Sequence, residues 1–103
     1  MSRGPDVTAQ LERALLTSAR AAGCPLDLIT SEMTRWASAT FAGTRHELKL
    51  TAGALPAFDD WLEALPEADL ALRDHLVADL VIQWRRREGG ASTVALEVLT
   101  IEA

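Results

Sequence analysis

The sequence predicts an α+β protein with the element order αββαββ, in which two helices cover one face of a four-stranded antiparallel sheet. Three observations support this fold class. Apolar residues recur at helical spacing in residues 5–22 and again in 56–65, and they alternate with polar residues in 44–52. Two long apolar runs then flank the Gly89-Gly90 pair, which is typical of a hairpin. Both helices can bury their apolar sides on one sheet face, which makes a two-layer sandwich.

The first helix is expected over residues 5–22. Pro5 is tolerated in a first helical turn, and the carboxylate of Asp6 complements the positive end of the helix dipole. Gly23 and Pro25 end the helix, because glycine adopts the left-handed conformation after a helix and proline cannot continue one. The residues that recur on the apolar side are Val7, Leu11, Ala14, Leu15, Ser18 and Ala22.

A hairpin is expected from residues 32–41 and 44–52, after a short apolar link at 26–29. The alternation is clearest in the second strand, where apolar residues and His46 share one side and charged residues share the other. One side of this hairpin is therefore expected to face the core. The residues on that side are His46, Leu48, Leu50 and Ala52.

The register of this hairpin decides where Trp36 lies. A two-residue turn at Ala42 and Gly43 places Trp36 on the outer side, opposite Lys49. A three-residue loop instead brings Trp36 inward, opposite Leu50. The sequence leaves both registers open.

A short second helix is expected from near Pro56 to Pro66, followed by a loop over residues 66–74. Trp61 flanks the apolar side of this helix. The carboxylates on its other side are interpreted as a solvated surface, because hard cations normally need several oxygens converging from a loop. The apolar side consists of Leu55, Phe58, Leu62 and Leu65, and the acidic side consists of Asp59, Asp60 and Glu63.

The last hairpin has the strongest strand pattern in the chain. A two-residue turn at Gly89 and Gly90 would pair Ile82 with Glu97, whereas a three-residue loop over 88–90 pairs Ile82 with Leu96. We expect the three-residue loop, with one glycine in the left-handed conformation, because it pairs apolar residues with each other. The pairs in this register are Trp84 with Val94, Ile82 with Leu96, and Leu80 with Val98.

This register predicts a second, partly apolar sheet face on the side without helices. Trp61 and Trp84 are expected in the core between the layers, and Trp36 is the candidate for the outer surface. Contiguous exposed apolar side chains mark interaction sites, and most soluble oligomers bury them symmetrically. The expected partner is a second copy of the chain or another protein. The candidate interface residues are Trp36, Val77, Val81, Leu99 and Ile101.

His46, His75 and Arg85 are candidate residues of a ligand pocket. Histidine titrates near neutral pH, and an arginine can hold an anionic group by charge-assisted hydrogen bonds. Structural roles are the alternative for each, since His46 falls on the expected core side and the arginines protect a strand edge. No metal-ligand spacing or phosphate-binding loop is present, so neither a metal nor a cofactor is expected. Cys24 follows a helix end whose dipole disfavours a reactive thiolate.

Charge and composition limit the functions that the chain can have. The 103 residues carry a net charge of −5, and between Asp59 and Asp79 seven carboxylates face a single arginine, Arg73. Nucleic acids are unlikely partners, because their binding depends on Lys and Arg at the phosphates. No apolar run reaches the roughly 18 residues of a membrane span, and no signal peptide is recognisable. We therefore expect a single domain over residues 1–103 in the cytoplasm.

The function that best fits these observations is a protein-association module, either homo-oligomeric or an accessory subunit. The alternative is a small-molecule-binding protein or a small enzyme, with a pocket between helices and sheet or at a dimer interface. The sequence contains no motif that names a reaction or a substrate.

Overall fold

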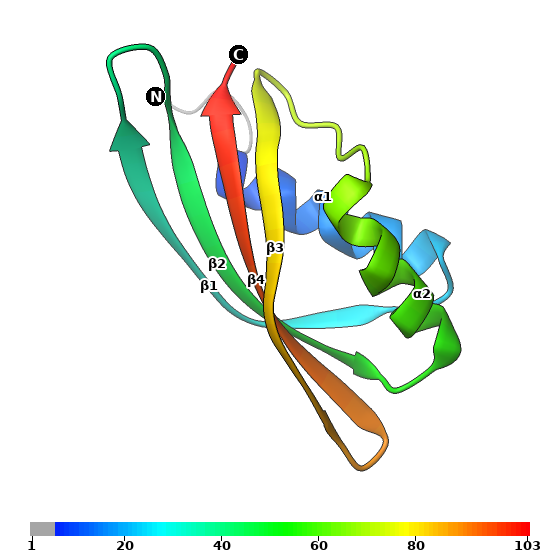
Figure 1. The fold of residues 1–103 in the computed structure, drawn as a ribbon. Coiled ribbons are helices and arrows are strands. Elements are labelled where there is room, and N and C mark those ends of the chain that lie inside the picture. The colour runs from blue at the N-terminus through cyan, green and yellow to red at the C-terminus, as the bar shows by residue number, and fades with distance from the viewer. Residues whose placement is uncertain (1–5) are drawn as a thin grey trace.

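A computed structural model describes residues 6–103 and confirms the predicted α+β fold (Figure 1). Two helices alternate with two hairpins, and the four antiparallel strands lie in the order β1-β2-β4-β3. The strands β1 and β3 are therefore the edges of the sheet, and the hairpins meet where β2 pairs with β4. The elements are α1 (Val7–Ala21), β1 (Leu26–Ala37), β2 (Ala42–Gly53), α2 (Pro56–Ala64), a 3-10 turn (Leu65–Glu67), β3 (His75–Glu88) and β4 (Ala91–Glu102).

The ends of α1 follow from local side-chain and backbone chemistry. Asp6 is the N-cap, and its carboxylate accepts a hydrogen bond of 2.9 Å from the backbone N–H of Ala9. Pro5 lies outside the described residues. Gly23 has a φ of +84°, the left-handed conformation expected after a helix. The thiol of Cys24 is buried and donates to the Ala19 carbonyl at 3.4 Å, and burial raises its pKa.

The core lies between the two helices and one face of the sheet, which we call the inner face. Alternate side chains of β2 and β4 are buried on this face, while those between them are more exposed. Trp61 on α2 donates a hydrogen bond of 3.0 Å to Ser18 on α1, which ties the two helices together. The most deeply buried apolar side chains of the cluster are Leu11, Leu15, Ala19, Leu50, Phe58, Leu65, Val94, Leu96 and Val98.

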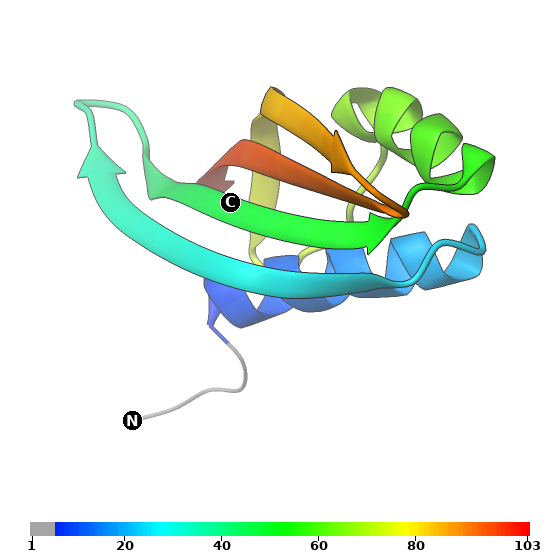
Figure 2. The same ribbon diagram turned by 90° about the horizontal axis from the view of Figure 1, so that it is seen from below.

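The opposite side of the sheet, the outer face, has no helix over it within residues 6–103. Figure 2 shows that the strands curve along their length and that α1 and α2 lie at different places beside the sheet. Within the same residues, no helix is long and apolar enough to cross a membrane.

Both expected registers of the first hairpin are wrong. The strand β1 begins at Leu26, and residues 38–41 form a four-residue turn that pairs Trp36 with Gly43. Ser38 closes this turn, because its hydroxyl accepts from the N–H of Phe41 at 3.0 Å. Gly43 lies inside the strand instead of the turn. Trp36 is on the outer face, as in the two-residue alternative, but opposite Gly43 instead of Lys49.

The second hairpin is closed by a two-residue turn at Gly89 and Gly90, so the three-residue loop is wrong. One expectation is confirmed: Gly89 adopts the left-handed conformation, with a φ of +59°. A bulge at Gln83 adds the extra residue that we expected in the loop. The pairs Ile82–Leu96 and Leu80–Val98 are therefore as predicted.

The same bulge moves Trp84 to the outer face, where it pairs with Ala95 and is 39% exposed. The prediction that Trp84 lies in the core is therefore wrong. A second bulge at Ala78 turns Val77 towards the inner face, where it packs against the core. Its neighbour Leu76 points outward in its place and is exposed. Val77 is thus removed from the outer face on which the sequence had placed it.

Candidate functional site

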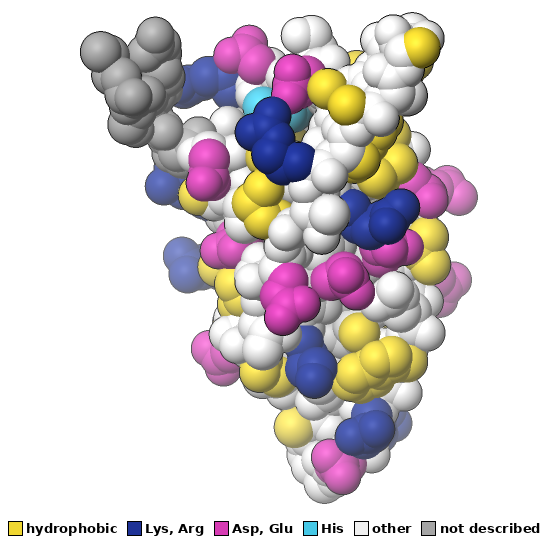
Figure 3. Space-filling view, turned by 90° about the vertical axis from the view of Figure 1, so that its left-hand side faces the viewer, with side chains coloured by type: hydrophobic (Ala, Val, Ile, Leu, Met, Phe, Trp, Pro, Cys, Tyr) yellow, Lys and Arg dark blue, Asp and Glu magenta, His cyan; other side chains and the backbone are white. Residues whose placement is uncertain are grey.

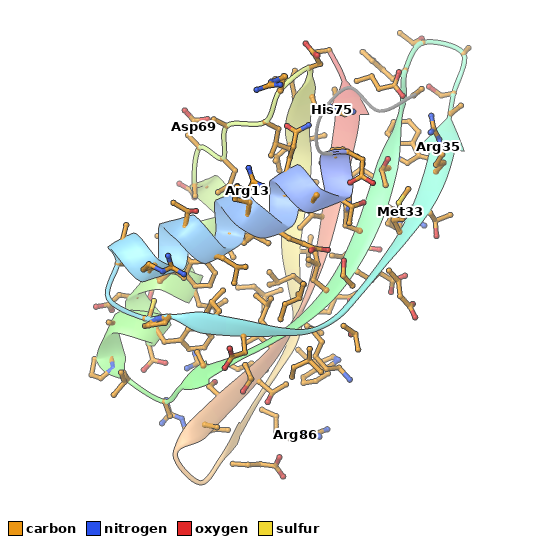
Figure 4. All side chains as sticks on the ribbon, turned by 180° about the vertical axis from the view of Figure 1, so that it is seen from behind. Arg13, Met33, Arg35, Asp69, His75 and Arg86 are labelled. Carbon is orange, nitrogen blue, oxygen red and sulfur yellow. The ribbon has the colours of Figure 1, made fainter. Side chains whose placement is uncertain are left out.

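The three candidate pocket residues do not form one site. His75 and Arg85 are ten residues apart on β3, which corresponds to about 30 Å along a strand. Figure 4 shows His75 beside the start of α1, whereas Arg86, next to Arg85 in the chain, lies at the other end of the sheet. A pocket built from both histidines and Arg85 is therefore excluded by the length of the strand.

Arg85 has a structural role between the sheet and α2. Its guanidinium forms a salt bridge with Asp59 and lies over the ring of Phe58, 5.7 Å from the centroid. The hydrogen bond from Arg85 is the main reason that the pKa of the Asp59 carboxyl is lowered. Arg87 also approaches Asp59, at 3.4 Å. These contacts hold the start of α2 against β3.

His46 is fully buried on the inner face. Its Nε2 lies 3.0 Å from the hydroxyl of Thr100, and that hydroxyl donates to the carbonyl of Thr44 at 3.3 Å. With the hydroxyl hydrogen directed to Thr44, Nε2 is the donor to Thr100, and in the neutral ring Nδ1 then carries no proton. Burial is the main cause that lowers the pKa of His46, with a smaller lowering by His75 and a raising by Asp6. The ring is a neutral part of the core.

His75 is half-buried, and its Nδ1 is 2.9 Å from the carbonyl of Arg73, which can only accept. This bond fixes the ring at the start of β3. Within residues 6–103, no group of three or more His, Cys, Asp or Glu side chains is arranged to hold a metal ion.

The outer face carries the other set of predicted residues. Trp36, Val81, Leu99 and Ile101 all lie there, because each pairs with a strand position that faces away from the helices. Val81 is exposed, and the other three are half-buried. Four of the five candidate interface residues thus share one surface.

The register of the four strands aligns the outer-face residues in rows that cross the sheet. We name each row by its character and give its members in the strand order β1, β2, β4, β3. From one end of the sheet to the other they are the apolar row (Trp36, Gly43, Ile101, Leu76), the arginine row (Thr34, Arg45, Leu99, Asp79), the glutamate row (Glu32, Glu47, Glu97, Val81), the lysine row (Thr30, Lys49, Ala95, Trp84) and the threonine row (Asp27, Thr51, Thr93, Arg86).

The glutamate row places three carboxylates side by side. Glu32 is directly opposite Glu47, and Glu47 is directly opposite Glu97. Like charges in opposite positions of an antiparallel pair are destabilising. Arg45 compensates one of them, with its Nε 3.4 Å from the carboxylate of Glu97. The sheet therefore retains a local electrostatic cost at the middle of its open face.

The lysine row presents an aromatic ring between two cations. Lys49 Nζ lies 5.6 Å from the ring centroid of Trp84, and Arg86 Cζ lies 5.3 Å from it. On the side of the molecule shown in Figure 3, acidic side chains gather at mid-height, with apolar and basic ones below them. A shallow hollow of about 370 Å³ lies beside the ring. Its lining residues are Thr30, Glu32, Glu47, Leu48, Lys49, Gln83, Trp84 and Ala95.

A separate groove of about 630 Å³ runs between α1 and the segment 68–73. Arg13 on α1 and Asp69 on the segment come from its two walls (Figure 4). The backbone N–H of Arg73 donates to the side-chain oxygen of Gln10 at 2.6 Å, which fixes the segment against the helix. The small and apolar lining residues are Ala14, Ala68, Leu70, Ala71 and Leu72.

Sequence reasoning missed Leu76, Trp84 and the glutamate row as features of the outer face. The two bulges in β3 caused the first two errors, since each shifts the alternation by one residue. The alternation in β2 did place Glu47 and Lys49 on the solvent side, but their neighbours across the sheet depend on a register set by Ser38.

The chain was compared with protein-family models, with curated proteins and with solved structures, and none of them matches.

Proposed function

We propose that the chain is a protein-association module that binds another folded subunit through the outer face of its sheet. The observation that carries this proposal is the uncovered apolar surface of β3. Leu76, Val81 and Trp84 are all exposed there, although both helices pack on the inner face. Large apolar side chains gathered on one open surface are typical of protein interfaces.

The chemistry of the rows supports a protein partner. Aromatic and arginine side chains are enriched in interfaces, and the outer face combines Trp36 and Trp84 with Arg45 and Arg86. The buried free thiol of Cys24 is compatible with a cytoplasmic protein, and we place the association in the cytoplasm.

Site-specific photocrosslinking tests this function without assuming the identity of the partner. A photoreactive amino acid replaces Thr93 on the outer face, and the matched control carries it at Glu63, an exposed residue of α2. The full chain is expressed in its native cell and irradiated. We expect one discrete protein adduct from position 93 and none from position 63, and mass spectrometry identifies the adduct. Equal labelling at both positions, or no adduct from position 93, would contradict the proposal.

The groove between α1 and the segment 68–73 supports a second candidate function, the binding of a small apolar acid. Its volume is within the range of ligand pockets, and Arg13 and Arg73 form part of its lining. Neither arginine has a carboxylate within salt-bridge distance among the described residues. Titration with decanoate, followed by amide chemical shifts, should perturb Ala14 and Leu70 in the wild type but not in Arg13→Glu. Shifts that are spread evenly over the chain would contradict this candidate.

A further inference from the structure

We propose that the partner on the outer face is a second copy of this chain. The two copies are related by a two-fold axis that runs across the strands, between the glutamate row and the lysine row. This inference rests on the proposed function and names the partner of the same surface. The position of the axis follows from a comparison of the two possible axis directions, along the strands and across them, and of the rows that face each other in each.

A two-fold axis that runs along the strands is excluded by charge. Such an axis keeps every row opposite itself, so the glutamate rows of both copies meet. The reversed strand order then brings Glu47 of each copy opposite Glu97 of the other, with one arginine from each copy near Glu97. Like-charge contacts of this kind disfavour the arrangement. The glutamate row thereby selects against one of the two simple ways to stack the sheets.

A two-fold axis across the strands reverses their direction and exchanges the rows. Each residue of the glutamate row then faces the lysine-row residue on the same strand of the second copy. Glu47 meets Lys49 of the second copy, and Lys49 meets its Glu47. On β3, Val81 meets the ring of Trp84. Both contacts occur twice because the interface is symmetric.

The next rows outward are also complementary. The arginine row faces the threonine row, so Asp79 on β3 meets Arg86 of the second copy, and Leu99 meets the methyl group of Thr93. Two acidic residues of each copy, Glu47 and Asp79, thus meet basic residues of the other copy, whereas Glu32 and Glu97 meet the uncharged Thr30 and Ala95. The charges are distributed for an antiparallel pairing of the surface with itself.

The available area fits a dimer of ordinary size. Four strands about 4.8 Å apart and at least twelve residues long, at about 3.3 Å per residue, outline about 760 Å², which is the upper limit of the area in contact because the strands curve. A stable interface of standard size buries about 800 Å² on each partner. Twisted sheets that stack face to face cross at about 30°, which a small tilt of the axis from the perpendicular provides.

A charge-exchange experiment tests this arrangement. Glu47→Lys opposes two lysines at each symmetric contact, and Lys49→Glu opposes two glutamates. We expect each variant alone to dissociate with a Kd raised about tenfold or more, measured by light scattering over a dilution series. An equimolar mixture of the two variants restores opposite charges at both contacts, so it should form a heterodimer with a Kd near that of the wild type.

Two further comparisons separate dissociation from unfolding. Glu47→Lys places a lysine between Glu32 and Glu97, which relieves the like-charge row, so the variant should fold at least as well as the wild type. Lys49→Glu also loses its contact with the Trp84 ring, so its fold is checked by circular dichroism. The matched controls are the exposed Arg20→Glu on α1 and Glu63→Lys on α2, which change charge equally and should stay dimeric.

The outcomes distinguish this inference from the proposed function. A wild-type chain that is monomeric at every concentration overturns the homodimer, and two single variants that both remain dimeric overturn its placement on the outer face. If the equimolar mixture of Glu47→Lys and Lys49→Glu does not form a heterodimer, the proposed position of the axis is wrong. If the photocrosslinked adduct at position 93 is a different protein, the association function stands and the second copy is rejected. If no adduct forms, both are rejected.

Discussion

His46 makes the stability of this fold dependent on pH. Its pKa is lowered in the folded protein, mainly by burial, whereas the unfolded chain has the ordinary value of about 6.5. Between these two values the unfolded state binds more protons than the folded state, so the free energy of unfolding rises with pH. The contribution is complete above the unfolded pKa and is lost as the pH falls towards the folded pKa.

We therefore expect the free energy of unfolding to fall as the pH is lowered from about 7.5 to about 5. His46→Leu should remove most of this dependence, because leucine does not titrate, and the fold should tolerate it because Thr100 keeps its hydrogen bond to the Thr44 carbonyl. Urea denaturation at several pH values measures the free energy of unfolding of the wild type and of His46→Leu. His75→Gln is the control and should retain most of the dependence, reduced by the smaller lowering that His75 exerts on the pKa of His46. A slope that survives in His46→Leu would assign the effect to other groups.

Gly43 is required by close packing at the end of the outer face. A Cβ at this position would overlap the carbonyl oxygen of Thr100 and crowd the ring of Trp36. Gly53, at the other end of the same strand, has no atom nearer than 3.7 Å to the corresponding position. We expect Gly43→Ala to reduce the free energy of unfolding by about 2 kcal/mol, and Gly53→Ala to leave it nearly unchanged. Thermal denaturation of the two variants compares them, and equal losses would show that packing is not the cause.

At the scale of the elements, α2 begins without a side-chain cap. Its N-cap is Leu55, which is 51% exposed and lends no polar atom to the free N–H groups of the first turn. Leu55→Asp should raise the free energy of unfolding by about 1 kcal/mol and the Tm by about 4–8 °C. Phe41→Asp is the matched control, since Phe41 is 52% exposed but lies in a hairpin turn. An equal rise in the Tm of Phe41→Asp would show that replacing an exposed apolar side chain, and not capping of the helix, causes the stabilisation.

The helices could be predicted from the sequence, whereas the strand registers and bulges could not. Helices α1 and α2 were predictable because capping, glycine and proline signals are local to each helix. The side chain of Ser38 sets the register of the first hairpin. The sequence pattern instead predicts a turn at Gly43, which lies inside the strand. The bulges at Ala78 and Gln83 have no local signal, and they decided the positions of Val77 and Trp84. The shared face of Trp36, Val81, Leu99 and Ile101 was therefore predictable from alternation, whereas the separation of His75 from Arg85 follows from their both lying on one long strand.

At the scale of the whole molecule, association adds to the stability of the folded chain. Binding of a second copy to the folded state alone makes the Tm rise with protein concentration. We expect the Tm of the wild type to rise over a hundredfold range of concentration and that of Lys49→Glu to stay constant. Differential scanning calorimetry measures both. A Tm of the wild type that is independent of concentration would show that folding and association are not linked.

The positions of the three bulges have a consequence for how far assembly can proceed. Ile29 interrupts β1 and Ala78 and Gln83 interrupt β3, while the pairing of β2 with β4 is continuous. The irregularities are thus confined to the two edges, where an unbroken strand would offer its free N–H and C=O groups to another molecule. Edge-to-edge addition repeats without end and produces fibres, whereas stacking by faces is complete once the one open face is covered. Interrupted edges beside a regular centre therefore favour a closed particle over a growing polymer.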